Sequence, residues 1–415
     1  MKTFKNLCTI ALFLVLSIVS VSLNAQRKTS KEYDPVVKEL QELYNSNKDF
    51  KQLLDNALAS AVPTPDGWSL DPNDDTKLYK WPDKNINDFL DFFQDWLHFV
   101  PDPTNGMDYY VVLYGLCYNN TNALKFVATE PGLSWTKKYV EARGDYMDSK
   151  ESINDNIKTM DAWKEALGDA WDNFEPLHLK SKAYEGYTTF NEFFTRSLKD
   201  STIRPISESD DPGILVSPAD GLINIINENL NTESRIHTKY EEYLNVDQLL
   251  GGSEYAKYFI GGTATGTVLL PADYHHYHSP AEGKVVEAKA VDSEGGVYFG
   301  MDGQFFTYKN NSNVGGYMSD YGVFSVYHRG YYIIKTENFG YIAMIAVGLD
   351  DISSINFEGK FKPEIVAKQA VNVKKGERIG HFAYGGSTVI LLFEAGVLDG
   401  LKLKQGAQIG VLNTK

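Results

Sequence analysis

The spacing of hydrophobic residues divides the chain into two parts. From about residue 33 to residue 167, apolar residues recur at helical intervals, as in Val37, Leu40 and Leu43. The aromatic residues between Phe89 and Phe99 keep the same spacing, which is typical of the core-facing side of a helix. The first part of the chain is therefore expected to be mostly helical.

The pattern changes after the polar stretch 207–213. Short runs rich in β-branched and aromatic residues follow, bounded by Gly and Pro, and they occupy residues 214–216, 267–270, 331–334, 341–347 and 388–393. Many short strands without long helices between them favour an antiparallel sandwich or barrel. The predicted fold class is α+β, with a mostly helical N-terminal region followed by a β-rich, sandwich-like or barrel-like domain.

A weak internal repeat lies within the β-rich part. Residues 217–223 and 279–285 share the form Ser-Pro-Ala-acid-Gly-x-aliphatic, which predicts two similar β-turn-β units that pack together. Pro followed by an acidic residue and Gly is ordinary turn chemistry. Taken alone, this motif favours a turn at Asp220 over a catalytic role.

The N-terminus has the layout of an export signal. A short basic segment precedes an apolar stretch from Leu7 to Leu23, and a small residue, Ala25, stands before Gln26. The sequence predicts a signal peptide over residues 1–25 and an exported protein, periplasmic or secreted. Retention of the stretch as a membrane anchor is the alternative, because its length is close to the minimum for crossing a bilayer.

Composition excludes some classes of function. The formal net charge is -15 and there is no long Lys/Arg run, so a nucleic-acid partner is not expected. Only Cys117 remains after removal of the signal peptide, which excludes an intramolecular disulfide. A single Cys of this kind is expected in the core.

Three separate places supply an acid, an imidazole and a hydroxyl: Asp220, the histidines at 275, 276 and 278, and Ser387. The three clustered histidines could hold a metal or lie in a solvated turn. Metal sites usually draw ligands from a second place, and the sequence has no second compact cluster, so no metal is expected. An imidazole acting as a proton donor or acceptor is the favoured interpretation.

The Gly385-Gly386-Ser387 segment has two interpretations. It could be a flexible connection before the last strands. Alternatively, the Ser387 hydroxyl attacks the carbonyl of Gly386, whose missing Cβ permits the tight bend that this attack requires.

Four motifs occur together in a recognisable order. They are Phe190-Asn191-Glu192-Phe193-Phe194-Thr195-Arg196-Ser197-Leu198-Lys199 with Arg204-Pro205, then Ser217-Pro218-Ala219-Asp220-Gly221, Asp273-Tyr274-His275-His276-Tyr277-His278, and Gly386-Ser387-Thr388. In this order they resemble the phosphatidylserine decarboxylase family, over about residues 184 to 415. The predicted division is thus a signal peptide (1–25), a mostly helical domain (26–183) and a decarboxylase-like catalytic domain (184–415).

The resemblance implies a set of site residues. The chain would cut itself between Gly386 and Ser387, and Ser387 would become a pyruvoyl group, the cofactor. His278 would activate Ser387, Asp220 would orient His278, and His275 would serve the decarboxylation step. The physical logic agrees, because a Ser hydroxyl needs a base and an imidazole held by a carboxylate is a recurring solution. The small chain, 387–415, is expected to stay with the large one.

Two departures from the family pattern concern the substrate. Gly385 stands where the family usually has Leu, and a helical extension precedes the catalytic domain, as in the branch that includes soluble aromatic amino acid decarboxylases. The substrate is an amine-bearing carboxylate: phosphatidylserine in a membrane is favoured, and a free amino acid such as tryptophan is the alternative. A non-catalytic exported β-sandwich binding module is the alternative of another class.

Overall fold

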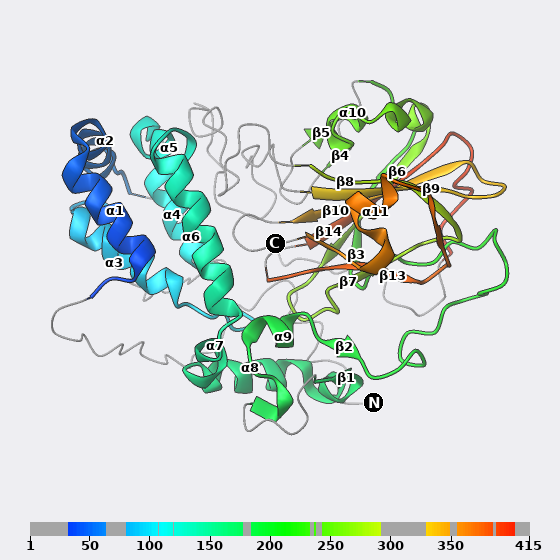
Figure 1. The fold of residues 1–415 in the computed structure, drawn as a ribbon, viewed down its shortest axis with the longest axis horizontal. Helices are drawn as coiled ribbons and strands as arrows, with labels where there is room; N and C mark the ends of the chain where they lie inside the picture. The colour runs from blue at the N-terminus through cyan, green and yellow to red at the C-terminus, as the bar shows by residue number, and fades with distance from the viewer. Residues whose placement is uncertain are drawn as a thin grey trace, which may run out of the picture.

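The computed structural model contains a helical body and a sheet-rich body (Figure 1). It describes residues 32–63, 80–106, 108–118, 120–176, 184–232, 236–237, 243–291, 329–348, 355–384 and 387–402. The expected signal peptide, Gly385 and Gly386 lie outside these ranges. Among the helices it describes, none is long and apolar enough to cross a membrane.

Six helices form the larger part of the helical body: α1 (Pro35–Ser46), α2 (Lys48–Ala59), α3 (Ile86–Leu97), α4 (Asp108–Cys117), α5 (Thr121–Ala128) and α6 (Gly132–Met147). Below them in Figure 1 lie α7 (Glu151–Asn154), α8 (Ile157–Leu167) and α9 (Phe190–Phe194). Side-chain caps define several helix starts, since Asn47 accepts hydrogen bonds from the backbone at the start of α2 and Asn85 forms a capping box at α3.

The aromatic face of α3 forms the centre of the helical body. Phe89, Phe92, Phe93 and Trp96 are each at most 1% exposed. The Phe93 ring meets the Trp135 ring edge-on, with centroids 4.8 Å apart. The predicted helical region and the predicted burial of this aromatic stripe are both confirmed, and Cys117 is buried as expected.

The sheet-rich body contains a seven-stranded antiparallel sheet in the order β12-β8-β9-β10-β14-β6-β3. Its strands are β3 (Leu222–Asn227), β6 (Thr263–Leu269), β8 (Gly283–Val291), β9 (Arg329–Lys335), β10 (Tyr341–Gly348), β12 (Val371–Val373) and β14 (Ser387–Phe393). A second sheet, in the order β11-β13-β7, consists of β7 (His276–His278), β11 (Ile355–Phe357) and β13 (Arg378–Phe382).

Shorter elements complete the description. Two two-stranded sheets pair β1 (Phe174–Glu175) with β2 (Ser197–Leu198) and β4 (Ile236–His237) with β5 (Tyr243–Leu244). The remaining helices are α10 (Val246–Leu249) and α11 (Pro363–Val366), with 3₁₀ turns at Gly168–Asn173, Tyr184–Gly186, Glu254–Phe259 and Gly359–Phe361.

The central strands β9, β10 and β14 of the large sheet are buried on both faces, which explains why they are almost continuously apolar. Alternate residues point to opposite faces. Met344 and Leu391 belong to a core that also contains Tyr277 and Phe382 of the small sheet, so the two sheets share a core as in a sandwich. Ile345 and Ile390 belong to the cluster that contains the helical body's aromatic residues. The α+β fold class is confirmed.

Four of the five predicted strands are present, as β6, β9, β10 and β14. The prediction of a strand at 214–216 is wrong, because these residues are irregular. Val216 donates one backbone hydrogen bond to Pro280 O at 3.0 Å, and a single bond of this kind does not make a ladder.

The internal repeat is confirmed as a packed pair. Besides the bond from Val216 to Pro280, the backbone N–H of His278 donates to Pro218 O at 2.7 Å, so each unit bonds the other. The two turns are also alike, because Ser217 Oγ donates to Ala219 O and Ser279 Oγ donates to Ala281 O. The pairing places the turn that contains Asp220 beside the strand that contains His278.

Candidate active site

Ser387 lies at the first position of the central strand β14. It pairs with Gly348 of β10 on one side and Leu269 of β6 on the other. Its side chain is fully buried, and its Oγ has no hydrogen-bond partner among the residues that the structure describes. A buried hydroxyl without a partner costs free energy and calls for a functional explanation. Strand alternation directs this hydroxyl to the face of Val389, which is the face that the small sheet covers.

The His278 ring is held at both nitrogens. Nδ1 lies 2.8 Å from the carbonyl oxygen of Gly376, so Nδ1 carries the proton and donates it to this carbonyl. Nε2 is then the acceptor nitrogen, and the Tyr274 hydroxyl donates to it at 3.3 Å. Burial lowers the pKa of His278 below its ordinary value. The ring is therefore kept neutral, in the form that can accept a proton at Nε2.

Asp220 is held by Arg204. Arg204 Nε lies 2.9 Å from Oδ1 and Nη2 lies 2.6 Å from Oδ2. A guanidinium that meets a carboxylate through two nitrogens is a strong and well-oriented partner. The expectation that Asp220 orients His278 therefore differs from the hydrogen bonds seen here, in which the Gly376 carbonyl and the Tyr274 hydroxyl hold that ring.

His275 lies in an apolar environment and is 1% exposed. Its ring packs against Phe194 of α9 with centroids 3.9 Å apart. The Phe194 ring also contacts Tyr384, which precedes Ser387 by three positions, at 5.2 Å. His275 thus lies where α9 meets the segment that leads into β14.

Two further charged residues border this site. Arg196 is 2% exposed, and its Nη2 donates to the carbonyl oxygens of Ala272 at 2.6 Å and Asp273 at 3.1 Å. Burial lowers the pKa of Arg196 to about 10. Burial also raises the pKa of Asp273 to about 6, and the Asp220 carboxylate adds to this shift. Both residues stand in the motifs of the sequence, but composition and spacing gave no reason to single them out.

Comparison with known proteins agrees with the site. The family model described as phosphatidylserine decarboxylase matches residues 190–411, which is more than half of the 415-residue chain. This range includes Ser387, all three clustered histidines, Asp220 and Arg204. The chain belongs to the phosphatidylserine decarboxylase family.

Individual relatives support the same membership. The chain is 34% identical over 210 residues to the phosphatidylserine decarboxylase proenzyme of Fusobacterium nucleatum, which covers 51% of this chain and 61% of that protein. It is 30% identical over 282 residues to the phosphatidylserine decarboxylase proenzyme of Clostridium novyi, and this match covers 66% of this chain and 82% of that protein. It is also 24% identical over 293 residues to the decarboxylase iboD of Amanita muscaria, and this match covers 66% of this chain and 80% of that protein. The chain thus spans less than two thirds of the Fusobacterium protein.

Proposed function

We propose that the chain is a self-cleaving, pyruvoyl-dependent carboxy-lyase that converts phosphatidylserine to phosphatidylethanolamine and carbon dioxide. The observation that carries this proposal is the buried hydroxyl of Ser387 at the start of β14, for which the described part of the chain offers no hydrogen-bond partner. Relatives that are named phosphatidylserine decarboxylase proenzymes support both the substrate and the processing of a precursor.

The proposed cut uses the chain's own groups. Ser387 Oγ loses its proton to a base and attacks the Gly386 carbonyl carbon, so that the peptide bond becomes an ester and the Ser387 nitrogen becomes an amine. Loss of the Ser387 Cα proton then breaks the Cβ–Oγ bond and releases Gly386 as a carboxylate. Hydrolysis of the remaining dehydroalanine releases ammonia and leaves a pyruvoyl group at the new N-terminus.

His278 is the proposed base. Its neutral ring and the unprotonated Nε2 fit this role, and the Gly376 carbonyl fixes the tautomer as a carboxylate does in a serine triad. Asp220 supports the site through Arg204, which keeps its carboxylate in one orientation.

The pyruvoyl group would supply a carbonyl that withdraws the electrons of the breaking bond between carbon and carboxylate. The residues around Ser387 fit such a group, because the surrounding core is apolar and the hydroxyl position is buried. His275 is the proposed proton donor to the substrate carbon, and its apolar surroundings keep water from competing.

The substrate and the location of the enzyme belong to the same proposal. An exported protein that acts on phosphatidylserine would meet its substrate at a membrane surface. The small chain 387–415 would remain with the large chain, since β14 is paired on both sides.

The test uses the purified full chain. A denaturing gel and intact mass are expected to show a cut before Ser387, and Ser387→Ala should stay uncut while remaining folded. Carbon dioxide release is then measured with phosphatidylserine vesicles and, separately, with free serine and tryptophan. Release from vesicles supports the lipid substrate, and release from tryptophan alone overturns it. An uncut, active wild-type chain would overturn the pyruvoyl mechanism.

A further inference from the structure

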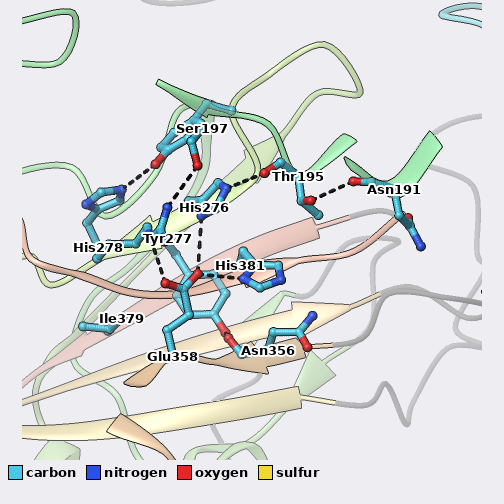
Figure 2. A network of polar contacts seen from close by, with 12 residues as sticks. Asn191, Thr195, Ser197, His276, Tyr277, His278, Asn356, Glu358, Ile379 and His381 are labelled. Atoms are coloured by element: carbon cyan, nitrogen blue, oxygen red, sulfur yellow. Dashed lines mark hydrogen bonds and ion pairs between the residues drawn. The ribbon is translucent and has the colours of Figure 1, made fainter. Parts of the chain in front are cut away.

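A second polar cluster lies on the small sheet and plays no part in the proposed cut. His276 of β7 pairs directly with His381 of β13, and their rings lie 5.3 Å apart. Glu358 follows β11 and stands two positions after Asn356, the residue that pairs with His381 on its other side. Directly opposed residues and their i+2 neighbours share one face of a sheet, so β7, β13 and the residue just after β11 contribute one side chain each. Figure 2 shows dashed lines that join the Glu358 carboxylate to both histidine rings.

The His276 ring is held in one tautomer. Its Nε2 lies 2.9 Å from the carbonyl oxygen of Thr195, so Nε2 carries the proton. The ring is almost completely buried, at 3% exposed, and within the described ranges Nδ1 has no hydrogen-bond partner. The Nδ1 lone pair instead lies 3.5 Å from Glu358 Oε1, a distance suited to an ion pair only if Nδ1 is protonated. In the neutral ring, two acceptor atoms therefore face one another (Figure 2).

The other ligand atoms are already oriented. His381 Nδ1 lies 2.7 Å from Glu358 Oε1, and Arg378 Nε donates to Oε2 at 2.7 Å. Arg378 thus binds Oε2 of Glu358, and the other carboxylate oxygen, Oε1, points toward both histidines. The available ligand atoms of the three residues all lie within 4.8 Å of one another. A shared positive charge at this point would relieve the repulsion between the facing acceptors.

A proton and a metal ion are the two candidates for that charge. Nε2 of His276 already directs its proton at the Thr195 carbonyl, so a second proton at Nδ1 would place a full positive charge on a ring that is only 3% exposed. The nearby Arg378 charge weakens binding of cations that depend on carboxylates alone, such as Ca²⁺ or Mg²⁺. Two imidazoles with one carboxylate oxygen are instead typical of Zn²⁺, with bonds of about 2.0–2.2 Å to nitrogen and oxygen.

We propose that His276, Glu358 and His381 bind one divalent transition-metal ion of the zinc class through Nδ1 of each ring and Oε1 of the carboxylate. The Thr195 carbonyl orients the buried histidine from behind, as outer partners of metal-bound histidines commonly do. The sequence pointed away from a metal because Glu358 and His381 lie far along the chain from the histidine cluster.

The site borders the proposed active site without containing its reactive groups. The Tyr274 ring stacks on His276 with centroids 4.6 Å apart, and the Tyr274 hydroxyl lies 3.3 Å from His278 Nε2. The ion would fix the ring of His276 and, through the stack, the position of Tyr274. Metal binding itself requires neither the cut nor the decarboxylation.

The experiment measures binding on the full chain after treatment with a chelator. Zn²⁺ is titrated by calorimetry, and Co²⁺ is added to follow the visible absorption of the bound ion. We expect one ion per wild-type chain and a Tm that rises with Zn²⁺. Glu358→Gln and His381→Ala should each weaken binding by more than the roughly 10-fold to 100-fold that loss of an outer partner costs. His98→Ala, a half-exposed histidine paired with Asp34 in the helical body, should bind as the wild type does.

Folding of each metal-free variant is checked by circular dichroism, and His381→Asn replaces His381→Ala if the latter does not fold. The proposal is overturned if the wild type binds no ion, or if Glu358→Gln and His381→Asn bind Zn²⁺ as tightly as the wild type. Because binding is read directly, this outcome is independent of whether the chain cuts itself.

Discussion

Arg204 binds the Asp220 carboxylate through two nitrogens, with Nε 2.9 Å from Oδ1 and Nη2 2.6 Å from Oδ2. If Asp220 acts in this orientation, Arg204→Ala should accumulate uncut chain as Asp220→Asn does, with cleavage slowed roughly 10-fold or more because a two-nitrogen contact is lost. The cleavage rate of Arg204→Lys should lie between those of the wild type and Arg204→Ala, because Lys keeps the positive charge but cannot bind the carboxylate through two nitrogens. A denaturing gel over time measures this, with Lys164→Ala as a control at another surface ion pair. If Arg204→Ala is cut normally while Asp220→Asn stays uncut, Asp220 acts without Arg204.

The two histidines should separate in function. His278→Ala removes the proposed base, so the uncut chain should accumulate. His275→Ala should be cut normally yet release carbon dioxide about 100-fold or more slowly, the usual range for loss of a proton donor. Cleavage and carbon dioxide release are measured side by side on both variants. A block of cleavage in His275→Ala as complete as in His278→Ala would contradict this division of roles.

Asp273 should make stability depend on pH. Burial raises its pKa from 3.8 to about 6, so the fold favours the protonated carboxyl. Its contribution to the free energy of unfolding is fully present below about pH 3.8 and is lost as the pH rises through about 6. The difference corresponds to on the order of 3 kcal/mol at most.

Asp273→Asn keeps an acceptor for the Leu270 N–H and removes the charge. We expect the variant to gain stability over the wild type at neutral pH and to lose that advantage near about pH 4. Denaturant unfolding at both pH values measures it, with Glu364→Gln on the surface of α11 as a control. An advantage of equal size at both pH values would mean that the Asp273 charge is not its cause.

Gly380 should tolerate no side chain. A Cβ at this position would lie 2.2 Å from the Tyr277 ring, and Tyr277 is fully buried with its hydroxyl donating to Asn356 O at 2.9 Å. Gly380→Ala should therefore destabilise the fold by about 1–3 kcal/mol or more, because the ring has no room to move. Gly400→Ala is the matched control, since a Cβ there meets nothing within 4 Å. Thermal unfolding of both variants measures the difference, and equal Tm values would contradict the packing described.

Much of the fold could be predicted because the buried positions of a helix or strand are occupied by apolar residues at regular intervals along the sequence. The α3 aromatic residues face one core, and strands such as β10 are apolar on both faces because both faces are covered. The order of the strands could not be predicted, since β14 lies between β10 and β6 through pairings between distant segments. The run at 214–216 has strand composition but lacks a neighbouring ladder, which composition does not reveal.

The candidate site divides in a similar way. Asp220, His275, His278 and Ser387 stand in recognisable motifs, and their roles remain predictions. The hydrogen-bond partners of these residues could not be predicted from the sequence. The group that fixes the His278 tautomer, for example, is a backbone carbonyl, which any residue at position 376 would offer. His276 and His381 become neighbours only through the pairing of β7 with β13, and no local motif records that register.

The position of Ser387 in the middle of the large sheet has a consequence for the mature protein. All seven residues of β14 pair with β10 on one side and β6 on the other. A cut before Ser387 would turn this strand into the first segment of a separate polypeptide without disturbing its pairing. Folding of the precursor is then unimolecular, whereas a denatured mature enzyme must reassemble from two dissociated chains at a rate that depends on dilution. The lifetime of a cut enzyme would therefore depend on slow unfolding, because the two chains are no longer covalently linked and do not refold efficiently once they separate.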